Sequence, residues 1–290
     1  MILVTGANGQ LGRRIVEHLI TRFGSTAGIA TGVRDTARAA DLAARGISVR
    51  PADFDRPAQL AAAFAGVDKL VLVSADGPRE QRIAQHRNAI GAARTAGVKH
   101  ILYTSFLDVA ADSPAEFAAV HRATEADLAA SGLKVTLLRN TLYADFLPMA
   151  LGDALRTGRF SLPAGAGKAS FVSREELAEA IAAAAAAPCL AKDVYELTGQ
   201  ALHDYHQVAA AVAQASGRAL RYEPVGEDGY AAALAGQGLP DWIARALATM
   251  YAAVAAGKFA RVGNDFAALV GHPPRPLACI AQELFGARPD

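Results

Sequence analysis

Cysteine, which builds disulfide frameworks, is scarce in this chain: two of its 290 residues are cysteines. Cys189 and Cys279 lie far apart, without other potential metal ligands at regular spacing, so we expect free thiols, no metal site and no catalytic cysteine. No apolar run reaches membrane-spanning length without polar interruption, and the N-terminus lacks a basic region and a cleavage site. We therefore expect a cytoplasmic protein.

A dominant charge is also absent. The 29 basic and 28 acidic residues leave a formal net charge of +1, and neither sign forms a long block. Nucleic-acid and membrane-surface binders usually carry a basic patch. We therefore expect no nucleic-acid partner and no membrane insertion, but a small-molecule ligand and a monomer or homodimer. The 52% hydrophobic content over 290 residues suffices for one large domain, or for a nucleotide-binding domain with a smaller lobe.

The most informative stretch is residues 2–12, with the sequence ILVTGANGQLG. It begins with an apolar run typical of a buried strand, and after it apolar residues recur at helical spacing. Gly6 permits a tight turn, Gly9 lets the backbone approach a pyrophosphate, and Gly12 lets the helix lie close to the strand. The free amides at the helix start are suited to bind the anion.

A glycine-rich turn by itself can also be a permissive loop. This one opens a series of alternating strands and helices, and it lacks the Lys-Ser/Thr ending of a mononucleotide P-loop, so a dinucleotide is favoured. The residues expected to contact the cofactor from this turn are Gly6, Asn8, Gly9, Gln10, Leu11 and Gly12.

Strands and helices alternate through the first half of the chain. The predicted strands are residues 2–4, 28–33, 47–51, 67–74, 98–105 and 133–139. The predicted helices begin at residues 11 and 57 or span residues 36–45, 80–95 and 115–131. This alternation predicts an α/β fold with a doubly wound parallel sheet.

The end of the second strand indicates which dinucleotide is bound. A carboxylate at this place holds the ribose 2′-hydroxyl of NAD, whereas Arg34 offers a guanidinium for the 2′-phosphate of NADP. Asp35 weakens this prediction slightly, although it also suits the start of the helix at 36–45. The alternative for Arg34 is an ordinary solvated charge. Asp53, after the third strand, either accepts a hydrogen bond from the adenine amino group or caps the helix from residue 57.

Ligands of open parallel sheets bind at the carboxyl ends of the strands. Val73 and Ser74 end the fourth predicted strand, and we expect them to line the ribose and nicotinamide. Thr104 and Ser105 end the fifth strand, after Tyr103, and are expected at the same pocket.

The segment at residues 140–147 leaves the sheet at this edge, and we expect it to cover the nicotinamide. Its candidate pocket residues are Asn140, Tyr143 and Phe146, with packing alone as the alternative role of Tyr143. On the helix at 80–95, His86 is predicted to be exposed.

Beyond residue 145 the alternation loosens. Short strands are predicted around 160–162 and at 220–225, and Ser173 is expected to start a helix. A strand at 193–198 is expected to return to the sheet. We therefore expect a dinucleotide-binding domain at 1–145 that includes this returning strand, and a smaller, mostly helical, partly interleaved substrate-binding lobe at 146–290.

Three segments, TGANGQLG at 5–12, HRATE at 121–125 and LRNTLY at 138–143, together resemble the NmrA-like atypical short-chain dehydrogenases. Within that group the chain is most similar to NADPH-dependent quinone reductases and triphenylmethane-dye reductases. The first motif is shared by many dehydrogenases, whereas the other two are more specific. Further similar segments are VSREELA at 172–178, VYEL at 194–197, GLP at 238–240 and LVGHP at 269–273.

The resemblance, which spans essentially the whole chain, implies a Rossmann domain with a smaller C-terminal lobe. It also implies NADPH in the turn at 6–12, Arg34 on the 2′-phosphate and a substrate cleft between the lobes.

One departure concerns catalysis. Ordinary short-chain dehydrogenases place Tyr and Lys four residues apart on the helix after the fifth strand, where the pair protonates an alkoxide. None of the seven tyrosines here has Lys at that offset. Related atypical reductases have Lys where this chain has His121, which implies His121 near the nicotinamide ribose or the substrate. The alternative is a half-buried or surface histidine that pairs with Glu125 one turn later.

The leading hypothesis is an NADPH-dependent reductase that transfers hydride to quinones or similar conjugated electrophiles, with cationic triarylmethane dyes as related substrates. A quinone becomes a phenolate, which needs far less acid assistance than an alkoxide. His121 and Tyr143 are the catalytic candidates, and Tyr143 and Phe146 are expected to shape the cleft. The alternative is an NADP-binding redox sensor without turnover. Epimerisation of nucleotide sugars is disfavoured by the missing Tyr/Lys pair.

Overall fold

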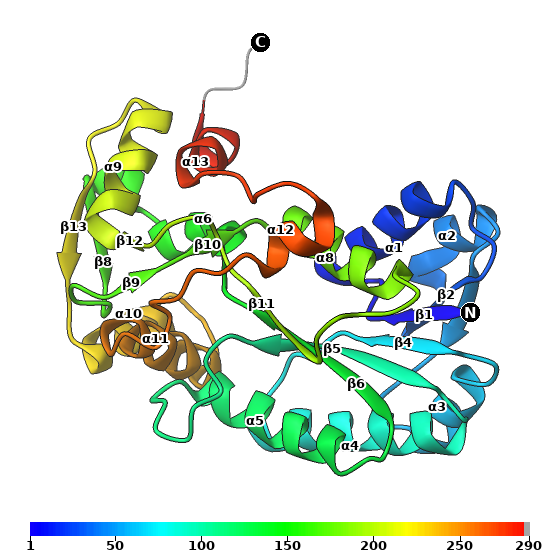
Figure 1. Cartoon of the computed structure of the whole chain (residues 1–290). Coiled ribbons are helices and arrows are strands. Elements are labelled where there is room, and N and C mark those ends of the chain that lie inside the picture. The colour runs from blue at the N-terminus through cyan, green and yellow to red at the C-terminus, as the bar shows by residue number, and fades with distance from the viewer. Residues whose placement is uncertain (287–290) are drawn as a thin grey trace.

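The computed structural model describes residues 1–286, and its centre is a parallel sheet of seven strands (Figure 1). The spatial order of the strands is β11-β6-β5-β4-β1-β2-β3. Their bounds are β1 (Ile2–Thr5), β2 (Ile29–Val33), β3 (Ser48–Pro51), β4 (Lys69–Leu72), β5 (His100–Phe106), β6 (Lys134–Asn140) and β11 (Val194–Leu197). The predicted α/β fold with a doubly wound parallel sheet is confirmed.

The direction of winding changes between β1 and β4. The chain proceeds from β1 outward to β3 on one side, then begins again at β4 and proceeds outward to β6 on the other. The loops after β1 and β4 therefore diverge to opposite faces of the sheet and leave a crevice at their carboxyl ends, where open parallel sheets bind ligands.

Helices cover both faces of the sheet (Figure 1), which explains why its strands are apolar on both sides. One face carries α1 (Gln10–Phe23), α2 (Ala40–Ala44), α8 (Arg174–Ala186) and α12 (Asp265–Val270). The other face carries α3 (Pro57–Ala63), α4 (Arg79–Thr95) and α5 (Glu116–Ala129). Ile15 and Leu19 of α1 and Ile181 of α8 are fully buried in the first of these layers.

The chain enters and leaves this sheet several times. After β6 it leaves the sheet, and it returns with α8 and β11, which pairs in parallel with β6 (Val194 beside Leu137). The predicted returning strand is thereby confirmed. The chain then leaves again and returns with α12, whose Phe266 is 1% exposed and packs in the same core as α8.

The remaining elements within residues 1–286 form a second group. It contains three two-stranded sheets, which pair β7 (Leu142–Tyr143) with β10 (Phe171–Val172), β8 (Arg159–Leu162) with β13 (Arg221–Pro224), and β9 (Lys168–Ala169) with β12 (His203–Asp204). Its helices are α6 (Leu147–Leu151), α7 (Ala154–Thr157), α9 (Tyr205–Ser216), α10 (Glu227–Gly236), α11 (Asp241–Ala255) and α13 (Leu277–Phe285). The division of the chain into domains at residue 145 stays a prediction.

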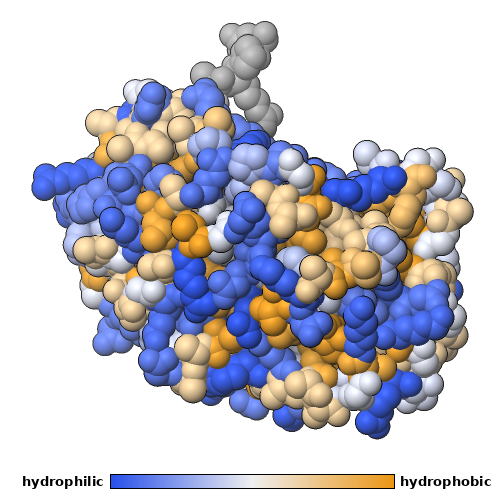
Figure 2. Space-filling view, viewed as in Figure 1, coloured by the Kyte–Doolittle hydropathy of each residue, from blue (hydrophilic) through white to orange (hydrophobic). Residues whose placement is uncertain are grey.

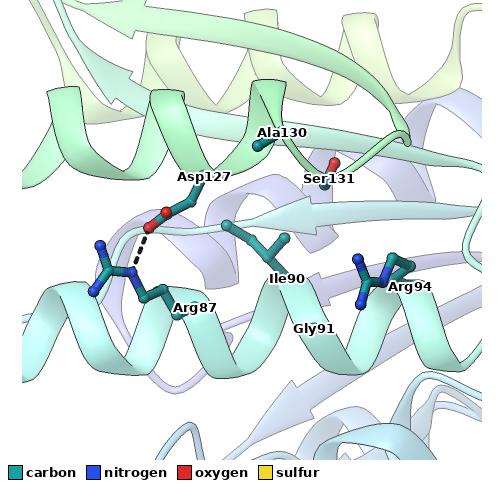
Figure 3. A pocket seen from close by; sticks show the side chains of 7 residues that line it. All are labelled: Arg87, Ile90, Gly91, Arg94, Asp127, Ala130 and Ser131. Atoms are coloured by element: carbon teal, nitrogen blue, oxygen red, sulfur yellow. Dashed lines mark hydrogen bonds and ion pairs between the residues drawn. The ribbon is translucent and has the colours of Figure 1, made fainter.

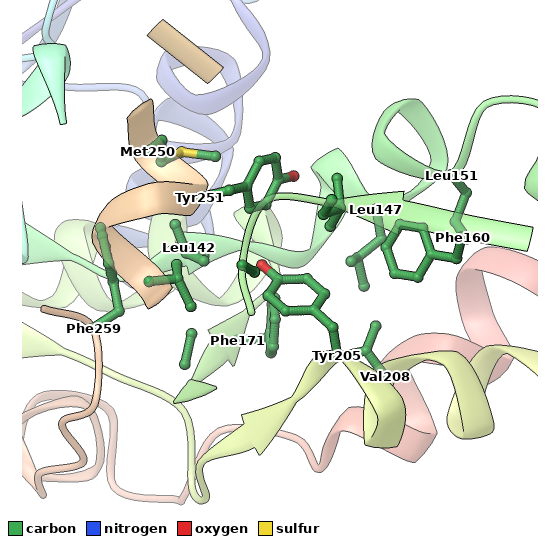
Figure 4. Close-up of a cluster of buried hydrophobic side chains, with 14 of the residues drawn as sticks. Leu142, Leu147, Leu151, Phe160, Phe171, Tyr205, Val208, Met250, Tyr251 and Phe259 are labelled. Atoms are coloured by element: carbon green, nitrogen blue, oxygen red, sulfur yellow. The ribbon is translucent and has the colours of Figure 1, made fainter. Parts of the chain in front are cut away.

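An aromatic cluster fills the core of this second group (Figure 4). Tyr205 at the start of α9 is fully buried and contacts Phe160 of β8 and Tyr251 of α11 edge to face, with ring centroids 6.0 and 5.8 Å apart. Edge-to-face pairs of this kind add stability beyond the burial of their surface. The cluster therefore joins a strand and two helices that lie far apart in the sequence.

Ser173 starts α8 as the sequence predicts. Its hydroxyl accepts a hydrogen bond from the Glu176 amide at 3.2 Å, and a Glu176 carboxylate oxygen accepts from the Ser173 amide at 3.1 Å. This reciprocal cap satisfies two otherwise free amides and typically contributes about 1 kcal/mol.

Hydrophilic and hydrophobic residues are interspersed over the face seen in Figure 2. Within residues 1–286, every helix is too short or too polar to cross a bilayer.

Candidate functional site

The turn after β1, residues 6–12, is called the glycine turn below. Gly6 has a φ of +69°, a conformation that side chains disfavour, and its carbonyl accepts a hydrogen bond from the Gly9 amide at 2.8 Å. A Cβ on Gly12 would lie 2.5 Å from the Gly6 oxygen, so only glycine lets α1 pack this closely on the strand. Gly9 precedes α1 without a side-chain cap, which leaves the first amides of the helix free for an anion.

The other residues of the glycine turn have different surroundings. The Asn8 amide nitrogen donates to the Asp35 carbonyl at 2.7 Å, while its buried side-chain oxygen has no partner. Gln10 accepts a hydrogen bond from the guanidinium of Arg174 on α8. Leu11 is 9% exposed and packs in the core, so only its backbone remains available to a ligand.

Arg34 follows β2, is exposed, and makes no hydrogen bond or ion pair with any residue in the described part of the chain. Asp35 accepts a hydrogen bond from the Ala37 amide at 3.0 Å, so its carboxylate supports the turn into the next helix. This arrangement leaves the guanidinium of Arg34 as the free charged group at the end of β2.

Asp53 does not cap the helix at residue 57. Arg56 occupies the position before α3, and the Asp53 carboxylate instead accepts from the Asp55 amide at 3.1 Å, inside the preceding turn. The capping alternative is therefore wrong, because Asp53 lies three residues before the N-cap position. Contact with adenine stays a prediction.

The carboxyl ends of β1, β4 and β5 are tied together by threonine hydroxyls. The Val73 amide donates to Thr5 Oγ1 and the Ser74 amide donates to Thr104 Oγ1, both at 2.9 Å. Thr104 and Ser105 are each 3% exposed, and the Ser105 hydroxyl donates to Glu125 at 2.6 Å. The side chains of Thr104 and Ser105, the two predicted pocket residues on β5, thus form hydrogen bonds with other protein groups. Val73 and Ser74 are partly exposed.

His86 of α4 is fully buried, contrary to the prediction that it is exposed. Its Nε2 accepts from the Ala75 amide at 3.0 Å, so the proton lies on Nδ1, which donates to Thr124 Oγ1 of α5 at 2.8 Å. Burial, reinforced by the charge of Arg82, lowers the pKa of His86 to about 3. The helix contacts that bury it come from α5, which the α4 sequence does not reveal.

His121 is 6% exposed and lies between Tyr103 and Arg82. Arg82 Nη2 approaches its Nε2 at 3.4 Å, and because a guanidinium can only donate, the His121 proton lies on Nδ1 and is directed to the Tyr103 hydroxyl at 2.8 Å. Burial holds the pKa of His121 well below its usual value and raises that of Tyr103 to about 12. His121 is therefore neutral and also stacks on Phe106, with ring centroids 5.6 Å apart.

The alternative that His121 pairs with Glu125 is wrong. Glu125 instead accepts from Arg139 of β6 at two positions, Nε at 3.0 Å and Nη2 at 2.6 Å, in addition to the bond from Ser105. The three hydrogen bonds of this carboxylate come from Ser105 and Arg139, near the ends of β5 and β6, and the partners of His121 are Tyr103 and Arg82.

Hydrogen bonds join side chains from β5, α4, α5 and the loop after β4 into one cluster, here called the Arg82 network. Its members are Ser74, Arg82, His86, Tyr103, His121 and Thr124. Sequence reasoning did not identify Arg82. The signal available was its position four residues before His86, which places both side chains on one face of α4.

Tyr143 and Phe146 form a second aromatic surface at this edge, with stacked rings 5.7 Å apart. The Tyr143 hydroxyl accepts from Asn140 at 2.8 Å, and burial raises its pKa to about 12. The Arg174 guanidinium lies 5.3 Å from the Phe146 ring centroid and pairs with Asp145 at 3.2 Å. Because Arg174 also reaches Gln10, this surface is linked directly to the glycine turn.

Two unpaired oxygen atoms and one exposed ring also bear on ligand binding. The side-chain oxygen of Asn140 is buried without a partner, as is that of Asn8. Phe146 is 41% exposed although it is large and apolar. Unpaired buried acceptors and exposed aromatic rings at one sheet edge are typical of a site that a ligand completes.

A separate hollow lies between α4 and α5 (Figure 3). Its lining residues are Arg87, Ile90, Gly91, Arg94, Asp127, Ala130 and Ser131. Arg87 and Asp127 form an ion pair of 2.8 Å across it. Because α5 runs antiparallel to the strands, its last residues lie toward the amino edge of the sheet, so this hollow is distinct from the ligand crevice. Among residues 1–286, no group of three or more His, Cys, Asp or Glu side chains is placed to hold a metal.

Known proteins of similar sequence are reductases. A model of the NAD(P)H-binding family matches residues 6–188. The chain is 40% identical over 285 residues to quinone oxidoreductase 2 of Escherichia coli (strain K12), with 98% of this chain and 99% of that protein covered. It is 30% identical over 290 residues to the NAD(P)H azoreductase of Xenophilus azovorans, with 99% and 100% covered.

Solved structures match equally widely. The NADPH-dependent quinone oxidoreductase of Escherichia coli, complexed with NADPH, superposes with a TM-score of 0.92 at 39% identity over 99% of this chain and 100% of that one. Triphenylmethane reductase of Citrobacter sp., complexed with NADP(H), gives 0.91 at 33% identity, with 98% and 99% covered. The family match and the identity to relatives of the same length show that this chain belongs to the NAD(P)H-binding family, among the NmrA-like reductases that its motifs resemble.

Proposed function

We propose that this protein uses NADPH to reduce quinones and similar conjugated electrophiles. The observation that carries the proposal is the hydrogen bonding and protonation of Tyr103, Tyr143 and His121 at the edge of the sheet. The Tyr103 and Tyr143 hydroxyls are both engaged and have pKa values raised to about 12, and His121 is a neutral hydrogen-bond acceptor toward Arg82. Such groups are poor acids, and a quinone, which becomes a phenolate, needs much less acid assistance than a ketone.

The residues present fit the cofactor. The glycine turn leaves a Cβ-free approach to the first amides of α1, which suits a pyrophosphate, and the free guanidinium of Arg34 suits a 2′-phosphate. The unpaired oxygens of Asn8 and Asn140 offer acceptors at either end of the crevice. NADPH supplies the hydride when it is bound.

The other predicted residues take supporting roles in this proposal. Asp53 accepts from the adenine amino group, while Val73, Ser74, Thr104 and Ser105 form the wall behind the ribose and nicotinamide. Tyr143 and Phe146 provide a flat aromatic surface on which a planar acceptor lies, and His121 shapes the opposite side. Orientation of the acceptor in a dry cleft then supplies most of the acceleration.

The relatives support the same acceptor class. The three relatives described above are named for the reduction of a quinone, an azo compound and triphenylmethane dyes, all of which are conjugated electrophiles. We further propose a cytoplasmic monomer or homodimer, with residues 1–145 as the cofactor domain and residues 146–290 as the substrate lobe.

The test is steady-state oxidation of NADPH with 1,4-benzoquinone, a cationic triarylmethane dye and an aliphatic ketone. We expect turnover of the quinone and the dye and little with the ketone, and losses below about a thousandfold in His121→Ala and Tyr143→Phe. Comparable ketone turnover, or a larger loss with cofactor binding unchanged, would show that an essential acid exists. NADPH binding without turnover of any acceptor would favour the redox-sensor alternative.

A further inference from the structure

Arg82 stands out among the charged side chains of the molecule. Its side chain is 6% exposed, yet it forms no ion pair with any carboxylate among residues 1–286. Nη2 donates to Ser74 Oγ at 2.9 Å and approaches His121 Nε2 at 3.4 Å, while Nε is buried without a partner. The charge of Asp76 acts on Arg82 from a distance, without a direct ion pair. A buried guanidinium that lacks a paired carboxylate is costly, so its retention calls for an explanation.

Arg139 provides the internal comparison. Its guanidinium, 22% exposed, is neutralised by the two-pronged contact with Glu125, and this bond raises its pKa. Burial lowers the pKa of Arg82, whose neighbours at hydrogen-bond distance are a hydroxyl and an imidazole. The charge of Arg139 is therefore paired within the protein, whereas that of Arg82 has no directly paired carboxylate.

The position of Arg82 is at the ligand crevice. It contacts Ser74, in the loop after β4, and its guanidinium carbon lies 5.6 Å from the ring centroid of Phe117 on α5. Ser74 and Phe117, which contact the guanidinium, are each partly exposed, as is Phe106, whose ring meets that of Phe117 with centroids 6.3 Å apart.

Phe117 and His121 occupy the same spacing on α5 that ordinary short-chain dehydrogenases use for their Tyr and Lys. Phe117 has no proton to donate, and His121 is neutral, so neither of these two residues contributes a charge. The positive charge comes instead from α4, through Arg82, which contacts both residues.

We propose that Arg82 is the cation of the acceptor site and stabilises the oxygen of a quinone that becomes negative during reduction. This inference rests on the proposed function. A quinone that accepts a hydride becomes the monoanion of its hydroquinone, with the charge on oxygen, and that oxygen then takes one proton from water. The hydride and its two electrons come from NADPH, which leaves as NADP⁺, so atoms and electrons balance.

A charge preference among acceptors follows. A quinone gains negative charge as the hydride arrives, so the buried cation stabilises its transition state more than its ground state. A cationic triarylmethane dye becomes neutral in the same step and is repelled by Arg82 at the start. Arg82 therefore favours neutral acceptors that become anions over acceptors that begin as cations.

The experiment compares Arg82→Gln and Arg82→Lys with the wild type, and uses Arg87→Gln as the matched control on the same helix, because Arg87 is exposed and pairs with Asp127 outside the crevice. For each protein, kcat and KM are measured with 1,4-benzoquinone and with a cationic triarylmethane dye. We expect Arg82→Gln to lower kcat/KM for the quinone by about a hundredfold and to leave that for the dye unchanged or raised. Arg82→Lys should recover part of the loss, and Arg87→Gln should behave as the wild type.

A binding measurement tests the same claim without turnover. We expect NADP⁺-loaded Arg82→Gln to bind 4-nitrophenolate at least about tenfold more weakly than the wild type, with unchanged affinity for neutral nitrobenzene. Equal weakening of both ligands, or an equal loss of turnover with quinone and dye, would overturn the inference and make Arg82 a structural residue. A parallel loss of NADPH affinity would make it a cofactor contact instead.

The measurements distinguish a wrong proposal for the function from a wrong proposal for the role of Arg82. If the wild type turns over neither acceptor but binds 4-nitrophenolate through Arg82, the proposed function is wrong and the anion site stands. If the wild type reduces quinone and Arg82→Gln does so equally well, the function stands and the role of Arg82 is wrong. If Arg82→Gln folds poorly, the role of Arg82 is tested with Arg82→Lys through the ratio of quinone turnover to dye turnover. This ratio does not depend on how much of the protein is folded.

Discussion

The glycine turn and the Arg82 network lie at the same edge of the sheet but are built by different means. The glycine turn is made of consecutive residues, and its binding groups are backbone amides that any sequence with the right glycines would present. The Arg82 network is made of side chains from β5, α4, α5 and the loop after β4, with partners up to 39 residues apart. The first therefore suits a constant ligand such as a dinucleotide, whereas the second can be tuned to the acceptor.

The largest expected effect removes the backbone site. Gly9→Val should abolish NADPH binding, because the side chain would fill the space that the pyrophosphate needs, while the fold persists because Gly9 is exposed. Calorimetric titration and circular dichroism measure the two effects. Gly12→Ala is the comparison and should instead destabilise the fold, since its Cβ would meet backbone atoms at 2.5 Å. Retained binding in Gly9→Val would mean that the turn is only a connector.

The next effect separates the phosphate contact from the backbone contact. Arg34→Ala should weaken NADPH binding by about ten- to a hundredfold, corresponding to the loss of a charge-assisted hydrogen bond of about 1.5–3 kcal/mol, and leave NADH affinity unchanged. Dissociation constants for both cofactors, measured with both proteins, provide the test. Equal affinities of the wild type for NADPH and NADH would contradict it.

A smaller effect probes the histidines of the Arg82 network. His86 is neutral in the folded state with a pKa near 3, whereas in the unfolded chain it takes up a proton below about pH 6.5. The unfolded state therefore binds more protons, and stability should fall as the pH drops below about 6.5, by about 2 kcal/mol at pH 5 for this residue alone. Urea unfolding at pH 7 and pH 5 measures the difference. His86→Gln should reduce it by about that amount, and the exposed His206→Gln should leave it nearly intact.

The smallest effect concerns the aromatic surface. Tyr143→Phe removes one hydroxyl that accepts from Asn140 and keeps the ring stacked on Phe146. We expect a loss of about 1 kcal/mol in the free energy of unfolding and quinone turnover within about tenfold of the wild type. A much larger loss of turnover at unchanged NADPH affinity would make the hydroxyl a proton donor.

Local features could be predicted from the sequence because their causes are local. The glycine turn and the Ser173 cap each depend on residues within one turn of the chain, and the alternation of strands and helices was enough to predict the parallel sheet. Asp53 was harder, because a carboxylate three residues before the N-cap position Arg56 supports the turn before the helix and does not cap it.

The Arg82 network could not be predicted because its causes are distant. His86 looks like a surface residue on a polar helix, but its partners in the structure are the Ala75 amide and the Thr124 hydroxyl of α5, 38 residues later. Glu125 likewise lies one helical turn after His121, yet its carboxylate pairs with the guanidinium of Arg139 on β6. In both places tertiary contacts override a helical spacing rule.

The path of the chain through the sheet bears on how the molecule can move. A protein with two lobes joined by one linker opens by bending a single hinge. Here the chain leaves the sheet after β6, returns with α8 and β11, and returns once more with α12, so several connections join the sheet to the elements around β8 and β13. All of them would have to flex together. Opening of the crevice is therefore best sought in the short segment at residues 144–151, which we propose to cover its edge. A change in amide hydrogen exchange that is confined to this segment on NADPH binding would be the signature.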